Sequence, residues 1–196
     1  TRKGKPVATL RSLEDESHVK TRLCQYEAYN NSKGLHIAKQ IVLGKIEGQN
    51  RVLRKYGLEV KENVVRVVEG VESNNLHSIR KRLLGIEGRY SDHYFHEIAQ
   101  LFPEGIRLEC RRTHKAYDGL NNIFNSAYEL LAWKVHIALI KAKLEPYLGF
   151  LHSLQFGKPS LICDFQELYR TLIDDFIIQY CQSLKEKDFI TKWENF

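Results

Sequence analysis

The sequence predicts a mainly α fold, and three observations carry this prediction. From about Glu14 onward, apolar residues recur at spacings of three and four, which is the period of an amphipathic helix. Proline and glycine punctuate the ends of these periodic stretches, so they separate one helix from the next. No internal repeat and no low-complexity tract interrupts the pattern. The period therefore indicates a bundle of helices over most of the chain.

The first residues differ from the rest of the chain. Residues 1–6 are basic and contain glycine, and residues 7–10 could form a short strand. We interpret residues 1–12 as the end of an N-terminal β domain or as a linker, and residues 13–196 as an α-helical domain. The fold class is thus mainly α, with at most one remnant strand at the N-terminus.

One helix and one ambiguous segment follow. Apolar residues recur at helical spacing from Leu35 to Leu53, with Ser32 as a possible N-cap and Gly57 as a fitting stop. Residues 60–70 are short and rich in valine, which is compatible with a strand. The spacing of glutamate and lysine in this segment fits a short helix equally well, so both alternatives stay open.

The second half of the sequence predicts three further helices. Residues 75–102 form one long periodic stretch that ends where the next residue is proline, which cannot continue a helix. Residues 120–144 form another, closed by Pro146. Residues 147–163 contain glycine and proline and predict a loop-rich connector. We expect Asp164 to open the last long helix.

Composition places the chain among folded globular proteins. Of its 196 residues, 43% are hydrophobic and 28% are charged, which excludes a disordered segment. Lysine interrupts the apolar stretches, and none approaches the roughly 18 apolar residues of a membrane span, so no membrane partner is expected. The formal charge of +6 mildly favours polyanionic partners such as nucleic acid.

Missing motifs exclude several kinds of site. The four cysteines are scattered and form no C-x-x-C pair, which excludes a zinc ribbon or a thioredoxin-like site and suits a reducing, cytoplasmic location. Neither a P-loop nor a dinucleotide-binding glycine motif occurs. Ser160 lacks the G-x-S-x-G surround of a hydrolase nucleophile.

Two acids at the start of the last predicted helix carry the first candidate site. Asp164 and Glu167 have the spacing of a capping box, in which each side chain accepts a backbone N–H of the first turn. Alternatively, one or both carboxylates are metal ligands, because a helix start can hold two acids near one point. His152 precedes them, and the intervening glycine and proline turn the chain so that His152 can face Glu167.

A third acid, Glu87, lies between Gly85 and Gly88 in a predicted helix. A glycine inside a helix costs about 1 kcal/mol relative to alanine, so we expect a compensating close approach by another backbone or by a ligand. The simpler alternative is close helix packing in which Arg80, Arg89 or a neighbour neutralises Glu87.

One histidine with two or three carboxylates suits Mg²⁺ or Mn²⁺ better than structural zinc, because most of the donors are hard oxygens. Such an ion can polarise a phosphate and activate a water or a 3′-hydroxyl for in-line attack. Lys158, Arg80 and Arg89 lie near the acids in the sequence and are candidate contacts to DNA phosphates. Acids within a basic surround are the pattern expected for phosphodiester chemistry.

At these residues the sequence resembles the CRISPR-associated Cas-one integrase family. Residues 87–95 are similar to the family's E-G-x-x-[AS]-x-x-Y-[FW] helix. Residues 118–131 are similar to its D-P-x-N…Y-x-L-L helix, although Gly119 stands where proline is usual. Residues 146–170 are similar to its P-Y-x-G-F-L-H…G-x-P-S-L…D-x-x-E-x-x-R segment, which is the most specific of the three.

The resemblance implies a helical C-terminal catalytic domain of the Cas-one type, with a divalent metal bound by Glu87, His152 and Glu167 and with Asp164 assisting nearby. It implies endonuclease and strand-transfer activity that inserts foreign DNA spacers into a CRISPR array, with double-stranded DNA as substrate. It also implies a homodimer that joins the small partner Cas-two. Because the family has an N-terminal β domain and a basic tail, we interpret the sequence as a fragment without them.

Other functions stay open at this point. A transposon-encoded relative would use the same chemistry to integrate its own element, and flanking domains and neighbouring genes would distinguish it. A non-catalytic helical DNA-binding module would keep the acids as structure and would bind DNA with salt dependence but without metal dependence. A hydrolase of small phosphate esters would turn over nucleotides without requiring DNA.

Overall fold

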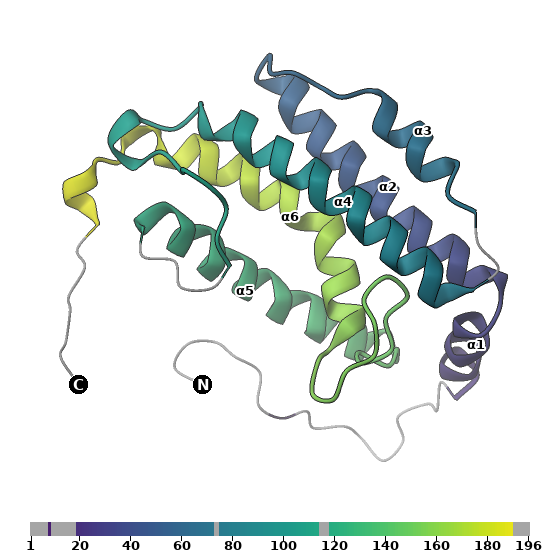
Figure 1. Cartoon of the computed structure of the whole chain (residues 1–196). Coiled ribbons are helices and arrows are strands. Elements are labelled where there is room, and N and C mark those ends of the chain that lie inside the picture. Colours follow the sequence, from purple (N-terminus) through teal and green to yellow (C-terminus); the bar gives the residue numbers. More distant parts are fainter. Residues whose placement is uncertain (1–7, 9–18, 73–74, 114–117, 190–196) are drawn as a thin grey trace.

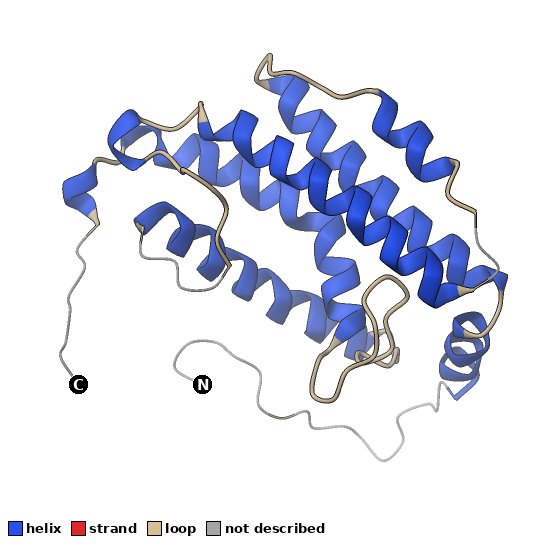
Figure 2. Cartoon of the chain, in the orientation of Figure 1, coloured by secondary structure: helices blue, strands red, loops and turns tan. Residues whose placement is uncertain are grey.

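The structure, a computed structural model, describes residue 8 and residues 19–72, 75–113 and 118–189 (Figure 1). Within these residues the fold is helical and contains no strand, which confirms the mainly α prediction (Figure 2). Apart from Ala8, the predicted strand at residues 7–10 lies outside the described residues. The helices of this part are α1 (Val19–Tyr29), α2 (Ser32–Lys55), α3 (Asn63–Glu69), α4 (Leu76–Ala99), α5 (Gly119–Lys141) and α6 (Ser160–Tyr180), with short 3₁₀ turns at Glu104–Ile106, Cys181–Ser183 and Glu186–Asp188.

Helix α2 is the centre of the bundle. It packs against both α4 and α6, and α6 packs in turn against α5. The short helix α3 contacts α2 and α4, and α1 contacts α2. The loop between α5 and α6 folds back beside the first half of α4, to which it is hydrogen-bonded (Figure 1). Two helices from later parts of the sequence, α4 and α6, therefore meet around α2.

The ends of α2 follow the chemistry of its capping residues. The N-cap is Asn31, whose side chain accepts the backbone N–H of Lys33 at 2.8 Å, so the predicted cap Ser32 is instead the first helical residue. Gly57 follows the helix with a φ of 68°, a left-handed conformation that glycine adopts without steric cost. The predicted stop at Gly57 is therefore confirmed.

Three further predictions on helices are settled by the structure. The valine-rich residues 60–70 contain α3, so the helical alternative is correct. The predicted helix over residues 75–102 is α4 with the turn that follows it. The predicted helix over residues 120–144 is α5, which Asp118 caps by accepting the backbone N–H of Asn121 at 2.8 Å. Local sequence signals were sufficient for these elements.

Helix α6 begins at Ser160, one turn before the predicted start at Asp164. The Ser160 hydroxyl binds the preceding loop, since it accepts the backbone N–H of Gly149 at 2.9 Å and donates to the carbonyl of Tyr147 at 2.6 Å. These bonds hold the loop against the first turn, so the helix starts earlier than the apolar pattern suggests. Asp164 therefore lies inside the helix, and the capping-box interpretation is wrong.

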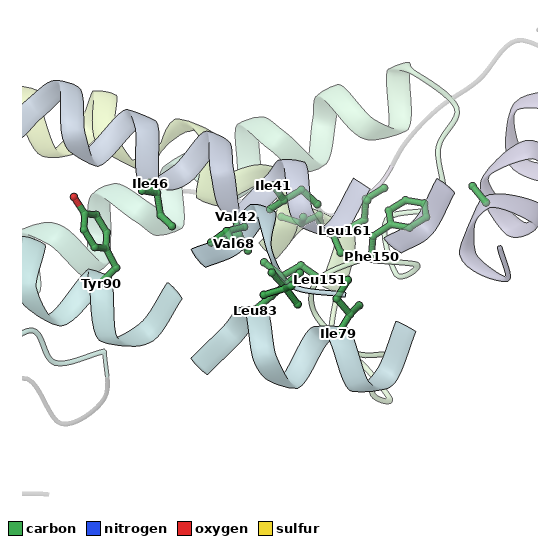
Figure 3. Packing of buried hydrophobic residues seen from close by; sticks show 14 of the residues in the cluster. Ile41, Val42, Ile46, Val68, Ile79, Leu83, Tyr90, Phe150, Leu151 and Leu161 are labelled. Atoms are coloured by element: carbon green, nitrogen blue, oxygen red, sulfur yellow. The ribbon is translucent and has the colours of Figure 1, made fainter. Parts of the chain in front are cut away.

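Two clusters of buried apolar side chains fill the bundle, one toward each end. Burying a large aliphatic or aromatic side chain contributes about 1.5–3 kcal/mol, so the clusters supply most of the driving force for packing. The first cluster (Figure 3) includes Ile41, Val42, Ile46, Val68, Ile79, Leu83, Tyr90, Phe150, Leu151 and Leu161. The second includes Leu53, Tyr94, Ile98, Phe102, Leu120, Phe124, Tyr128 and Ile177. No helix among the described residues has both the length and the apolar character needed to cross a membrane.

Candidate metal centre

A layer of polar side chains lies between the two apolar clusters. Along α6 these residues fall between those that contribute to the first cluster and those that contribute to the second. On α2 and α4, Lys45 and Glu87 come just before the last residue of the first cluster, and the other polar residues follow it. Burying a polar group costs free energy unless it finds a partner, so a polar layer at this depth indicates a paired network or a site. The layer comprises Lys45, Gln49 and Asn50 of α2, Glu87 and Ser91 of α4, and Asp164, Glu167, Thr171 and Asp174 of α6.

Two of the predicted metal ligands meet in this layer at the ammonium group of Lys45. The Nζ atom of Lys45 lies 2.6 Å from Oε2 of Glu167 and also forms an ion pair with Oε1 of Glu87. The side chains of Lys45, Glu167 and Glu87 are only 8%, 6% and 16% exposed. The neighbour that neutralises Glu87 is therefore Lys45, and neither Arg80 nor Arg89 has this role.

Further contacts fix the two carboxylates. The Ser91 hydroxyl donates to Oε1 of Glu87 at 2.9 Å, and Nη1 of Arg170 lies 2.7 Å from Oε1 of Glu167. Burial disfavours the charged form of Glu167, but Lys45 and Arg170 outweigh burial and lower the pKa of this carboxyl. Glu167 is therefore ionised near neutral pH, as a metal ligand must be.

Close packing of α2 on α6 brings Lys45 to Glu167. A Cβ atom at Gly48 would lie 2.8 Å from Oγ1 of Thr171, and one at Gly44 would lie 2.8 Å from Cδ2 of Leu168. Both glycines face α6, so the absence of a side chain lets the two helices approach. The G-x-x-x-G spacing around Lys45 is thus the sequence signal for this approach, and the sequence reasoning missed it.

No other backbone closely approaches Gly85 or Gly88 among the described residues, so the expected approach of another backbone is wrong, while the approach of a ligand stays a prediction. A Cβ atom at Gly88 would meet nothing within 4 Å, and one at Gly85 would meet only Nη1 of Arg89, at 3.9 Å. Gly85 is exposed and Gly88 is half-buried. Within the described part of the chain, neither glycine is therefore needed for close packing of α4 on a neighbouring helix.

Asp164 supports His152 from the interior of α6. Its fully buried carboxylate accepts the backbone N–H groups of Phe150, Leu151 and His152, the last two at 3.0 Å and 2.9 Å. It also binds Nδ1 of the His152 ring at 2.8 Å. This contact occupies Nδ1 and leaves Nε2 as the nitrogen available to a metal. A carboxylate behind a histidine is the usual outer support of a histidine ligand.

The loop that carries His152 is held from a second side by Arg80. The guanidinium donates to the carbonyls of Gly149 and Phe150 at 2.8 Å and 2.7 Å, and it lies 4.9 Å from the ring centre of Tyr29. Arg80 is buried, so the structure places it as a support of the His152 loop. Its predicted contact with a DNA phosphate stays a prediction.

The two other basic candidates lie nearer the surface. Arg89 is exposed on α4, and Lys158 is half-buried in the turn before α6, where its backbone N–H donates to the carbonyl of Gln155 at 3.1 Å. Their contacts with DNA likewise stay predictions.

A groove of about 750 Å³ opens beside the His152 loop. Its lining includes Asn30, Asn31, Asn75, His77, Arg80 and Ser153.

A second buried carboxyl, Asp174, extends the polar layer toward the second apolar cluster. It accepts the hydroxyl groups of Tyr94, at 2.9 Å, and of Tyr128. Burial raises the pKa of Asp174 to about 6, against the opposing effect of these hydrogen bonds. The guanidinium of Arg170 lies 4.9 Å from the ring centre of Tyr128 and so links this network to Glu167.

The sequence reasoning gave no role to Lys45, Arg170 or Asp174. A signal for Lys45 was present, because it stands four residues after Ile41 on the apolar side of α2, where a charge needs a buried partner. The structure therefore adds two cations and one acid to the predicted set.

The donor set fits a hard divalent cation. Among the described residues, no three histidine, cysteine, aspartate or glutamate side chains lie close enough to enclose an ion. Glu87 and Glu167 nevertheless converge on a cation, the Lys45 ammonium, and His152 is oriented by Asp164. Two carboxylates and one imidazole are donors that suit Mg²⁺ or Mn²⁺. Metal binding itself stays a prediction.

A helical bundle with a buried acidic pair, a supported histidine and basic residues nearby is of the class expected for the catalytic domain of a phosphodiester enzyme. The sequence matches the family described as CRISPR associated protein Cas1 over residues 1–195. The chain belongs to the Cas1 family, which confirms the resemblance.

Curated relatives agree with this assignment. CRISPR-associated endonuclease Cas1 1 of Archaeoglobus fulgidus is 32% identical over 183 residues, which cover 82% of this chain and 53% of the relative. CRISPR-associated endonuclease Cas1 3 of Thermus thermophilus is 35% identical over 158 residues, which cover 80% of this chain and 47% of the relative. The chain thus spans about half the length of these relatives.

Solved structures show the same helical fold. A casposase bound to integration product superposes with a TM-score of 0.80 at 25% identity, covering 97% of this chain and 55% of that one. A Cas1 protein from Thermotoga maritima gives a TM-score of 0.81 at 24% identity, covering 97% of this chain and 62% of that one. A Cas6-RT-Cas1–Cas2 complex gives a TM-score of 0.75 at 20% identity, covering 99% of this chain and 22% of that one. The predicted Cas1-type helical domain is therefore confirmed.

Proposed function

We propose that this chain is the catalytic domain of a divalent-metal-dependent DNA endonuclease and integrase that inserts foreign DNA spacers into a CRISPR array. The observation that carries the proposal is the convergence of Glu87 and Glu167, from two different helices, on one buried cation position. Family membership supports the proposal, and so does the similarity to a casposase whose structure contains an integration product.

We propose that Glu87, Glu167 and Nε2 of His152 hold the metal ion, with Mg²⁺ or Mn²⁺ as the ion. When bound there, such an ion would polarise the attacked phosphate and favour deprotonation of a 3′-hydroxyl or a water. The two carboxylates would supply the negative charge that attracts the ion. The support for this assignment is the chemistry of the donors and their burial, not a bound ion.

Several side chains would act by positioning these ligands. Asp164 fixes the His152 ring and the backbone that carries it. Ser91 orients Glu87, and Arg170 orients Glu167. Such outer partners hold a ligand in the geometry that binding requires, and their loss typically costs about 10–100-fold in metal affinity or activity.

For partners, we propose double-stranded DNA, a second copy of this chain and the small protein Cas2. Lys158 and Arg89 are the proposed contacts to the DNA backbone, since each is a cation close in the sequence to a proposed ligand and has solvent access. Arg80 is buried and bonded to the His152 loop, so we propose a positioning role for it. The solved complex whose name includes Cas1 and Cas2 shares the fold of this chain and supports the proposed partner on that basis alone.

The experiment that tests this function removes each proposed ligand in turn. Glu87→Ala, His152→Ala and Glu167→Ala should each abolish cleavage and strand transfer on double-stranded DNA in the presence of Mn²⁺, while circular dichroism shows an intact helical fold. Asp92→Ala, which removes an exposed acid on the same helix as Glu87, is the matched control and should stay active. Full activity in any one of the three variants would exclude that residue as a ligand.

The same assay separates the alternatives. DNA binding that weakens with salt but needs no metal, with no cleavage, would identify a non-catalytic DNA-binding module. Turnover of nucleotides without DNA would identify a hydrolase of small phosphate esters. A transposon-encoded relative would cleave and join DNA but prefer the ends of its own element over CRISPR spacers.

A further inference from the structure

The ammonium of Lys45 is a buried charge to which the proposed metal chemistry gives no role. It contacts an oxygen of Glu87 and, at 2.6 Å, an oxygen of Glu167, the two carboxylates proposed to bind metal. Its side chain is 8% exposed, and its helical neighbours Val42 and Ile46 are fully buried. A lysine in such a position is costly unless its charge is compensated, so both carboxylates contribute to keeping it there.

The local charges of this group balance. Glu87 and Glu167 contribute two negative charges, and Lys45 and Arg170 contribute two positive charges within ion-pair distance. A divalent cation on the same carboxylate oxygens would add two positive charges and would repel an ammonium at the same position. Both cations therefore cannot use these oxygens at once.

We propose that Lys45 is the resident cation of the acidic pair and that a divalent metal must displace it to bind. This inference rests on the proposed function, because it takes Glu87 and Glu167 as metal ligands. Lys45 keeps two like charges together before the metal arrives, and it weakens metal binding by the free energy of its own ion pairs. The measured metal affinity then reflects the free energy of metal binding less the free energy of the Lys45 ion pairs that the metal replaces.

The surroundings permit the ammonium to leave without a movement of the backbone. Gly44 and Gly48 hold α2 tightly against α6, so the helix itself is fixed. The lysine stem has four flexible carbons, which let its end group swing while the Cα stays in place. The Glu87 carboxylate is 16% exposed, so the group that Lys45 contacts is not closed off from solvent.

The test compares Mn²⁺ binding by the 196-residue chain and its variants, measured by electron paramagnetic resonance of the free ion. Lys45→Met keeps the length and apolar stem but removes the charge, so its Kd for Mn²⁺ should fall by about tenfold or more, which corresponds to about 1.4 kcal/mol. Lys45→Arg keeps the competing charge and should bind no more tightly than the wild type. Lys39→Met is the matched control, because Lys39 is a half-buried lysine of the same helix that donates to the carbonyl of Glu69, and it should leave the Kd unchanged.

The outcomes separate this inference from the proposed function. If wild-type binding is lost in Glu87→Ala, the metal site stands; an unchanged or weaker affinity in Lys45→Met would then overturn displacement alone. If Lys45→Arg binds as tightly as Lys45→Met, charge competition is also wrong. If neither the wild type nor Lys45→Met binds Mn²⁺, the metal site fails and the inference fails with it.

A second measurement uses the wild type, in case Lys45→Met does not fold. An amine-reactive acetylating reagent is applied with and without Mg²⁺, and mass spectrometry follows the acetylation of each lysine. Displacement predicts that acetylation of Lys45 rises severalfold with Mg²⁺ relative to that of Lys39. Equal acetylation of Lys45 in both conditions would refute displacement.

Discussion

Replacing Asp164 with alanine should destabilise the fold as well as the site. The Asp164 carboxylate is fully buried and accepts three backbone N–H groups and the His152 ring. Asp164→Ala removes the acceptor from all four donors at once. The loop over residues 149–152 would then keep only its bonds to Arg80 and Ser160 as polar anchors to the helices.

The magnitude follows from the donors left without a partner. Each buried group that loses its hydrogen bond costs about 1–3 kcal/mol, and water entering the loop recovers part of this. We expect a net loss of about 3–5 kcal/mol, the range seen when one partner of a buried charged pair is removed. At about 2–4 °C per kcal/mol for a chain of this size, the Tm should fall by roughly 6–20 °C.

The assay is thermal and urea unfolding followed by circular dichroism. Asp175→Ala is the matched control, because Asp175 lies next to Asp174 on the same helix but pairs with Lys55 at the surface. A solvent-exposed ion pair of this kind contributes little to stability, so the control should change little. A loss in Asp164→Ala within 1 kcal/mol of the control would refute the role given to this carboxylate.

Three further predictions follow from the same structure. Gly48→Ala should destabilise the chain by about 1–2 kcal/mol in urea unfolding, because the new methyl would meet the stiff Thr171 side chain. Gly44→Ala should destabilise it less, since the end of the Leu168 side chain can rotate away. Equal losses of stability in the two variants would contradict this account. The pKa of Asp174, raised by burial from 3.8 to about 6, means that the folded state binds its proton more tightly than the unfolded state. Its contribution to the free energy of unfolding is therefore present below pH 4 and is lost as pH rises through 6, by about 3 kcal/mol. Asp174→Asn should remove this contribution, so the free energy of unfolding of the variant should differ less between pH 4 and pH 7. Arg89→Ala should weaken DNA binding at all sequences and reduce the slope of log affinity against log salt by about one, whereas an unchanged slope would exclude a phosphate contact.

The sequence by itself determined the class of fold and singled out the candidate ligands, whose metal binding stays a prediction. Helix-forming periods, the glycine stop after α2 and the proline after α4 are local signals, because a helix depends on neighbours three and four residues away. The motifs around Glu87, His152 and Glu167 singled out those residues before any contact between them was known. These predictions need only residue types and short spacings.

Only the tertiary structure decided which groups face one another in the site. Local pattern suggested that Asp164 caps a helix, yet its partners lie in a loop folded back over α6. Lys45 lies more than one helix away from both of its glutamate partners in the sequence. It meets Glu167 because Gly44 and Gly48 let α2 approach α6, and it meets Glu87 because α2 also packs against α4. Such contacts depend on how helices pack against one another, and no short stretch of sequence contains that information.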